Sequence, residues 1–194
     1  LHAIDIGEIY SPVRVKAYAR EYGLNPGWGL DLTTTDEEGK AWDFTRVEMR
    51  NKAIRRVVQE KPYIVIGSPP CTYFSSLMRL NWNKIEPWEA EKRWSEALQH
   101  LNFCVQIYRL QSREGRYFLH EHPLGASSWK IPSIEEVMRK QGVIRTRAHQ
   151  CAYKHEGKDS EGVGLIYKPT AFLTNAPFLA EKLQRRCTNG STEE

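Results

Sequence analysis

Short apolar segments of strand length alternate with longer amphipathic segments along this chain, and that alternation restricts the folds open to it. Gly, Pro and polar turns separate the two kinds of segment. Such alternation is typical of a parallel sheet with helices on both faces. We therefore expect strands at 2–9, 26–32, 63–67, 117–121 and 143–151, and helices at 11–23, 45–59, 86–115 and 133–141. The sequence predicts an α/β protein with a doubly wound, mostly parallel sheet.

The remaining segments complete this prediction. A polar loop is expected at 33–44 and a charged loop at 154–162, followed by an edge or hairpin strand at 165–176. A chain of 194 residues can bury a full core, so we expect one domain over residues 1–187 and a disordered tail at 188–194. Because the chain runs almost directly into an apolar strand, we expect a domain trimmed from a longer polypeptide.

Composition restricts the compartment and the partners. A hydrophobic content of 40% and a charged content of 27% are ordinary for a soluble globular protein. No apolar run is long enough for a membrane span and no signal peptide precedes the first strand, so no membrane partner is expected. The four cysteines form no CxxC pair, which indicates an intracellular, reducing compartment rather than a disulfide framework. The net charge of +4 permits a polyanionic partner without requiring one.

Residues capable of chemistry recur where the predicted strands end. In an open α/β sheet the ligand crevice lies along the carboxyl ends of the strands. Three acids and a thiol fall there, which favours an enzyme over a binding module. The segments are 8–12, 31–32, 68–71 and 121–123, and they contain Glu8, Asp31, Cys71 and Glu121.

Cys71 is the strongest single candidate. It follows the apolar strand 64–67 through Ser68 and two prolines, and this rigid elbow prevents it from continuing the strand into the core. A helix opening at Thr72 would lower the pKa of the thiol through its dipole. An average cysteine is a small buried hydrophobe, but a thiol at a strand end is suited to nucleophilic attack.

These motifs resemble the cytosine-C5 methyltransferases, a class I family that depends on S-adenosylmethionine. GSPPCTYFS at 67–75 resembles the family's nucleophile motif, and FLHEHP at 118–123 resembles its acid motif, with His122 in place of the usual Asn. The first strand stands where the family has its cofactor loop. The second half of the chain resembles methyltransferase-like segments of phage and retroelement polyproteins.

The resemblance implies a Rossmann-like domain in which Cys71 is the nucleophile and Glu121 the catalytic acid. It implies that S-adenosylmethionine is bound, and S-adenosylhomocysteine released, by a set comprising Glu8, Ile9, Tyr10, Ser11, Pro12, Asp31, Leu32, Asp43, Phe44, Ser68 and Pro69. Within that set, Asp31 would hold the cofactor ribose and Asp43 would approach the adenine amino group. Substrate contacts are expected from Pro70, Ser75, Arg79, His122, Arg145 and Arg147. The partner would be nucleic acid, with DNA favoured over RNA.

The residues suit that chemistry. Cytosine C5 is a poor nucleophile, so a thiolate must first add to C6. The addition moves electrons toward N3, where an acid with a raised pKa can donate a proton. A thiol fixed on the protein reaches C6 only if the base is extruded from a duplex or the strand is single.

Two departures from the family pattern stand out. The family's cofactor loop has two or more glycines, whereas this chain has only Gly7 followed by EIYSPV, and fewer glycines restrict close backbone approach. About seventy residues follow Pro123, which leaves little room for a target-recognition region. We therefore expect a separate domain or chain to supply sequence recognition.

Two alternatives remain open. The first is a non-catalytic module that keeps a degenerate methyltransferase fold and binds nucleic acid or the cofactor; the glycine-poor loop motivates it. The second is a zinc-binding domain, for which His120, His122, His149, Cys151 and His155 would offer ligands, although no tight ligand pair anchors them.

Overall fold

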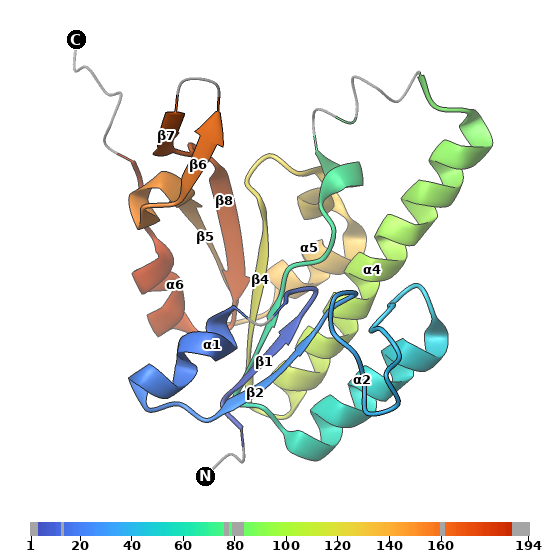
Figure 1. Ribbon diagram of the computed structural model, residues 1–194, viewed down its shortest axis with the longest axis vertical. Helices are drawn as coiled ribbons and strands as arrows, with labels where there is room; N and C mark the ends of the chain where they lie inside the picture. The colour runs from blue at the N-terminus through green and yellow to red at the C-terminus, as the bar shows by residue number, and fades with distance from the viewer. Residues whose placement is uncertain (1–3, 13, 76–77, 79–83, 160–161, 188–194) are drawn as a thin grey trace.

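The computed structural model describes residues 4–12, 14–75, 78, 84–159 and 162–187. Its centre is a six-stranded sheet in the order β2-β1-β3-β4-β8-β5 (Figure 1). The first four strands of that order run parallel to one another. Their bounds are Ile6–Ile9 for β1, Pro26–Leu30 for β2, Ile64–Gly67 for β3 and Tyr117–Pro123 for β4. The predicted α/β fold with a mostly parallel sheet is confirmed.

The strand β8 (Pro169–Thr174) lies inside the sheet. It pairs antiparallel with β4 on one side and with β5 (Ile144–His149) on the other. Of the two expectations for residues 165–176, the edge strand is therefore wrong, because β5 occupies the edge. Burial explains this position, since Ala171 and Leu173 are fully buried on one face of β8, and Thr170 and Thr174 on the other.

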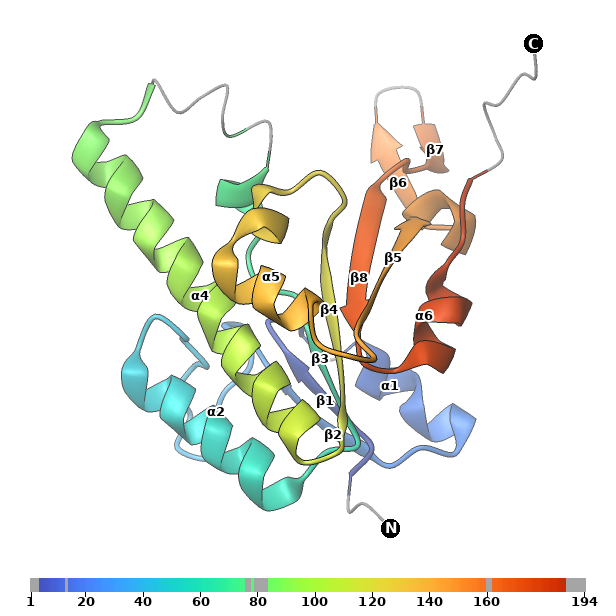
Figure 2. The same ribbon diagram turned by 180° about the vertical axis from the view of Figure 1, so that it is seen from behind.

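Helices cover both faces of the sheet (Figures 1 and 2). Two helices pack on one face, α1 (Val15–Ala19) and α6 (Pro177–Leu183). The opposite face is covered by α2 (Val47–Glu60), α4 (Pro87–Arg113) and α5 (Pro132–Met138). A proline stands in the first turn of α4, α5 and α6, where a missing backbone N–H leaves no hydrogen bond unmade.

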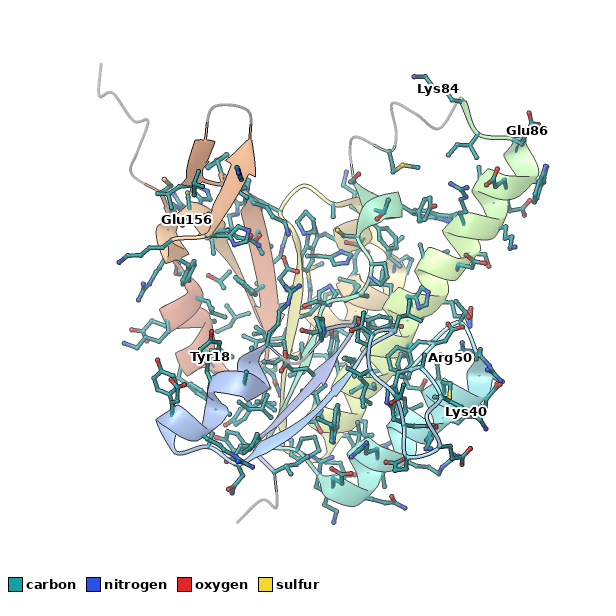
Figure 3. All side chains as sticks on the ribbon, in the orientation of Figure 1. Tyr18, Lys40, Arg50, Lys84, Glu86 and Glu156 are labelled. Atoms are coloured by element: carbon teal, nitrogen blue, oxygen red, sulfur yellow. The ribbon has the colours of Figure 1, made fainter. Side chains whose placement is uncertain are left out.

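The segment 11–23 forms less helix than its pattern predicts. After the five residues of α1 it tightens into the 3₁₀ turn η1 (Arg20–Tyr22), and Gly23 ends it with a φ of 70°. Ala19 is buried against the sheet, whereas Tyr18 is 62% exposed and points away from it (Figure 3). A short helix with one buried anchor has little packing to extend it.

A second, two-stranded sheet forms within and just beyond the segment predicted as a charged loop. The strands β6 (Glu156–Asp159) and β7 (Gly162–Leu165) pair antiparallel, with Gly157 opposite Gly164. This hairpin stands above the carboxyl ends of the parallel strands (Figure 1). Cross-strand bonds satisfy its backbone although β7 buries no side chain. Within the described part of the chain, no helix combines the length and apolarity needed to cross a membrane.

The long helix α4 approaches the end of β3 closely. A Cβ atom at Gly67 would overlap the Tyr108 hydroxyl, so only glycine leaves room for that side chain. Tyr108 is fully buried and stacks on Phe118 of β4, with ring centroids 4.7 Å apart. This contact seats α4 directly under the strand ends where the predicted site residues lie.

Candidate active site

The carboxyl ends of β1, β2 and β3 stop at the same level, and β4 passes that level and continues to Pro123. Ile9 pairs with Leu30 and with Gly67, and Gly67 pairs with His120. Because paired residues are level across a sheet, the residues that follow them share one edge. Those residues are Tyr10, Asp31, Ser68 and Glu121. The register thus brings the predicted cofactor and catalytic segments together, while their roles remain predictions.

The carboxylate of Glu8 organises the turn after β1. Glu8 is 1% exposed; the Ser11 hydroxyl donates a hydrogen bond to its Oε2 at 3.1 Å and the Arg14 N–H donates to its Oε1 at 3.3 Å. Ser11 also donates to the Pro12 carbonyl at 2.9 Å. The side chain of Ile9 is fully buried, so only its backbone reaches the edge. Glu8 therefore shapes this turn from beneath.

Tyr10 occupies the position where a glycine would be expected in the turn. Its φ of 58° lies in the left-handed region, which a residue with a Cβ adopts at a cost of about 1 kcal/mol. The side chain turns toward α4, where its hydroxyl lies 2.9 Å from His100 Nδ1 and its ring packs edge-on against Phe44. Burial raises the pKa of Tyr10 far above its usual value, so it stays neutral. This packing holds the strained backbone in place.

Asp31 ends β2 with its carboxylate held in one orientation. The backbone N–H and the hydroxyl of Thr33 both donate to Oδ1, at 3.0 and 2.8 Å. The Asp31 N–H donates to Thr34 Oγ1 at 2.9 Å, which fixes the strand end itself. Asp31 is half-buried, and the adjacent Leu32 is 66% exposed. The site edge therefore has an oriented carboxylate followed by an exposed apolar side chain.

Asp43 lies near the Tyr10 contacts although it is distant in sequence. The Thr45 hydroxyl and N–H donate to its Oδ1 at 2.7 and 2.9 Å, and the hydroxyl bond is the main reason that its pKa is lowered. His100, the partner of Tyr10, also lowers it. Phe44 is buried, and Arg50 donates to its carbonyl at 2.7 Å (Figure 3). Phe44 thus supports this region from the core.

The elbow after β3 leaves the sheet at Ser68, whose N–H donates to the Ile9 carbonyl at 3.2 Å. Pro69 is buried and Pro70 is exposed, so the chain turns outward between them. Cys71 then precedes the 3₁₀ turn η2 (Thr72–Phe74), and its carbonyl accepts from the Phe74 N–H at 3.0 Å. Its thiol is free and partly exposed. A one-turn 3₁₀ helix replaces the predicted α-helix start directly after Cys71, so its dipole is small.

His122 joins the elbow to β4. Its Nε2 donates a hydrogen bond to the Pro69 carbonyl at 3.0 Å, since a carbonyl can only accept. In the neutral ring Nδ1 is then an acceptor, and it takes the Ser128 hydroxyl at 2.7 Å. Burial of this side chain lowers its pKa to about 4, so the ring is neutral near pH 7. A direct bond therefore links the Cys71 loop to the strand that holds Glu121.

A second buried histidine lies behind His122. His120 is fully buried, its Nδ1 lies 2.9 Å from the Tyr108 hydroxyl, and its ring is 4.9 Å from that of His122. Burial, together with the neighbouring His122, lowers the pKa of His120 well below its usual value. His120 Nε2 has no hydrogen-bond partner among the described residues. The two neutral rings pack against Trp129.

Glu121 points to the other face of β4, between these two histidines in sequence. Its carboxylate is mostly buried, with Oε1 4.0 Å from Lys168 Nζ. Burial raises the pKa of Glu121, while the charges of Lys168 and Arg14 oppose the rise. A carboxyl group with a raised pKa keeps a larger protonated fraction near neutral pH and is suited to donate a proton.

The predicted substrate-contact residues separate into different settings. Ser75 follows η2 and its hydroxyl accepts from the Met78 N–H at 3.2 Å; Arg79 lies outside the described residues. Arg145 donates to the Leu124 carbonyl at 3.0 Å and its guanidinium lies 4.3 Å from the centre of the Trp129 ring. It braces the loop after β4. Arg147 is exposed on the edge strand β5, level with His122 and separated from it by β8.

Sequence reasoning missed the basic residues beside Glu121. Arg14 directly precedes α1, and Lys168 directly precedes β8. Because β8 is antiparallel, its first residues meet the carboxyl ends of the other strands, which brings Lys168 to the site edge. The only signal in the sequence was that Lys168 precedes the proline at the start of this strand. That signal does not indicate whether the strand runs parallel or antiparallel to its neighbours.

Within the described residues, no three His, Cys, Asp or Glu side chains gather closely enough to hold a metal ion. The zinc alternative therefore has no ligand set in that part of the chain. Comparison with protein-family models finds no match, and comparison with curated proteins finds no significant match.

The depressed pKa of His122 predicts a pH dependence of stability. Its pKa is about 4 in the folded protein and about 6.5 when unfolded, so the neutral ring favours folding above pH 6.5 and that contribution is lost as pH falls toward 4. Over this window the free energy of unfolding should fall by about 3 kcal/mol more in the wild type than in His122→Asn. Urea unfolding at several pH values measures the difference.

His155→Asn provides the matched control, because His155 is exposed and its substitution should leave the wild-type pH dependence unchanged. Parallel pH curves for the wild type and His122→Asn would show that His122 is not held neutral by burial.

Proposed function

We propose that this chain is a class I methyltransferase domain that transfers a methyl group from S-adenosylmethionine to C5 of cytosine in nucleic acid. The observation that supports it most is the hydrogen bond from His122 to the Pro69 carbonyl. That bond ties the loop of Cys71 to the strand end of Glu121, so the two residues that the chemistry requires belong to one rigid unit.

The sheet topology supports a Rossmann-like, class I interpretation. Four parallel strands are followed by an antiparallel strand, β8, placed inside the sheet next to the last parallel strand. Such a mixed, mostly parallel sheet flanked by helices is compatible with a Rossmann-like fold. The carboxyl ends of the parallel strands also form the edge where such folds bind ligands.

The residues at this edge fit the cofactor. Asp31 offers an oriented, half-buried carboxylate for ribose hydroxyls. Asp43 is distant from Tyr10 in sequence but lies near His100, to which the Tyr10 hydroxyl is bonded. Tyr10 adopts the backbone conformation that glycine would supply, and its side chain packs toward α4. The small number of glycines in this loop therefore need not block close approach of the cofactor to the backbone, because the Tyr10 ring lies away from the turn. When bound, the cofactor would supply an electrophilic methyl group on a sulfonium.

Cys71 and Glu121 then divide the chemistry on cytosine. The Cys71 thiolate forms a bond to C6, and the electron pair displaced from the C5–C6 double bond moves toward N3, where Glu121 donates its proton. The activated C5 accepts the methyl group. Removal of the C5 proton by a base, departure of the Cys71 thiolate and return of the N3 proton to the Glu121 carboxylate restore the ring and the enzyme. The buried setting of Glu121 is what keeps its proton available.

The substrate would be DNA in preference to RNA, with the target base extruded or the strand single. Lys168 and Arg14 place positive charge beside Glu121, and Arg147 is exposed on β5. Such charges favour a polyanion. A separate recognition domain or chain would select the sequence.

The alternative is a non-catalytic binding module of the same fold. The strained backbone of the turn at Tyr10 would favour this alternative if the protein had no affinity for the cofactor.

Cofactor binding is the first test. We expect S-adenosylmethionine and S-adenosylhomocysteine to bind in calorimetry, and Asp31→Ala to weaken both at least tenfold, because a charge-assisted hydrogen bond is worth about 1.5–3 kcal/mol. Glu38→Ala is the matched control, since Glu38 is an exposed acid paired with Lys40. Absence of binding to either compound would favour the non-catalytic module.

Covalent capture tests the nucleophile. An oligonucleotide containing 5-fluorocytosine, incubated with S-adenosylmethionine, should form a stable adduct, because fluorine at C5 blocks the final elimination. Cys71→Ala should abolish the adduct on a denaturing gel. Cys187→Ala is the matched control, because it also removes a partly exposed free thiol, and it should form the adduct normally. An undiminished adduct in Cys71→Ala would refute the assignment.

The role of Glu121 predicts a pH profile. Adduct formation should slow as pH rises through the pKa of Glu121, and Glu121→Gln should slow it by about 100-fold or more and remove this limb. Lys168→Met should move the limb to higher pH, because loss of the nearby positive charge raises the pKa of Glu121 further. The rates are measured by rapid quench. If the fall in rate occurs at the same pH in Lys168→Met as in the wild type, the assignment of Glu121 as the proton donor is contradicted.

A further inference from the structure

The segment after α6 returns to the end of the edge strand β5 and is fixed there by hydrogen bonds. The His149 N–H donates to the Arg185 carbonyl at 2.9 Å, and the Cys187 N–H donates to His149 Nδ1 at 3.1 Å. The Tyr153 hydroxyl donates to the Leu183 carbonyl at 2.7 Å. These three bonds hold residues 183–187 against β5 and against η5 (Gln150–Tyr153).

This docking brings two cysteines together. Cys151 is buried in η5, Cys187 is partly exposed, and both are free thiols. The nearness of Cys187 is the largest cause of a raised pKa for the Cys151 thiol. His149 fixes the backbone of Cys187 and lies two residues before Cys151, so these hydrogen bonds hold Cys187 beside the start of η5, the turn that contains Cys151. The other cysteines differ: Cys104 is fully buried in α4, and Cys71 belongs to the elbow.

We propose that Cys151 and Cys187 form a reversible disulfide when the protein meets hydrogen peroxide. The partly exposed Cys187 thiolate attacks one oxygen of the peroxide, forms a sulfenic acid and releases hydroxide, which leaves as water with the thiol proton. The Cys151 sulfur then attacks the sulfenic sulfur, the S–S bond forms, and a second water leaves with the Cys151 proton. Two thiols lose two electrons, and one peroxide becomes two waters.

The bond would convert a hydrogen-bonded contact into a covalent one. It closes a loop of about 35 residues that contains the β6–β7 hairpin, β8 and α6, and so restricts the unfolded chain strongly. Arg147 and Arg186 line one groove between β5 and α6, so the bond would also fix Arg186, the neighbour of Cys187, at that groove. This proposal does not depend on the methyltransferase assignment, because neither cysteine belongs to the proposed site.

Peptide mapping of the full chain tests the inference. The protein is treated with a small molar excess of hydrogen peroxide, free thiols are blocked, and trypsin is added without reductant. The peptide 148–154, which contains Cys151, should be recovered linked to the peptide 187–194, which contains Cys187. Most of both peptides should be in the linked form, and dithiothreitol should separate them. The melting temperature of the oxidised protein should rise by roughly 5–10 °C.

Two variants control the result. Cys187→Ser should give no linked peptide and no rise in melting temperature on oxidation, and its partly exposed position makes it tolerable to the fold. Cys71→Ala should retain the link in full. Separate alkylation of Cys151 and Cys187 after peroxide, oxidation of Cys187 without a link, or linkage of Cys187 to a second chain would each overturn the proposal.

Discussion

The hydrogen bond from His122 to the Pro69 carbonyl is the interaction on which the site geometry depends. It connects two strands whose ends would otherwise be related only through the sheet, and it anchors the elbow two residues before Cys71. The neutral ring serves both partners, because Nδ1 then accepts from Ser128 while Nε2 donates to Pro69. Burial among aromatic side chains keeps the ring neutral. A surface histidine at this position would titrate near neutral pH and would not fix the elbow in one state.

The two faces of strand β4 have different roles: one contains the histidines that position the elbow, and the other contains the proposed catalytic acid. His120 and His122 point toward α4 and the loop that contains Trp129, whereas Glu121 points to the opposite face and meets Lys168. The supporting face is neutral and closely packed. The other face has a carboxyl group whose pKa is raised by burial and restrained by nearby positive charge. Alternation along one strand thus gives neighbouring residues opposite electrostatic roles.

The turn after β1 shows how a position that favours glycine is occupied by a larger residue. Tyr10 takes a left-handed backbone conformation, and its bond to His100 and contact with Phe44 offset that cost. A loop with few glycines is therefore compatible with close approach to the strand end, because the bulk of the residue is packed elsewhere. Asp43 lies near the same His100, so the loop after β2 and the turn after β1 share one anchor on α4.

The sequence by itself determined the parallel strands and the helices, because periodicity and turn residues are local properties. It also determined that Asp31 and Cys71 would follow strand ends and that Glu121 would lie in the last residues of its strand, since a strand's end can be found from its own neighbours. Only the tertiary structure decided that β8 enters the sheet in reverse, which brings Lys168 to Glu121. It likewise decided that His122 binds the elbow, and that residues 156–159 pair with residues 162–165 within and just beyond a segment where charge predicted a loop. These outcomes depend on pairings between residues far apart in the chain, and a local pattern contains no record of which distant partner satisfies each donor and acceptor.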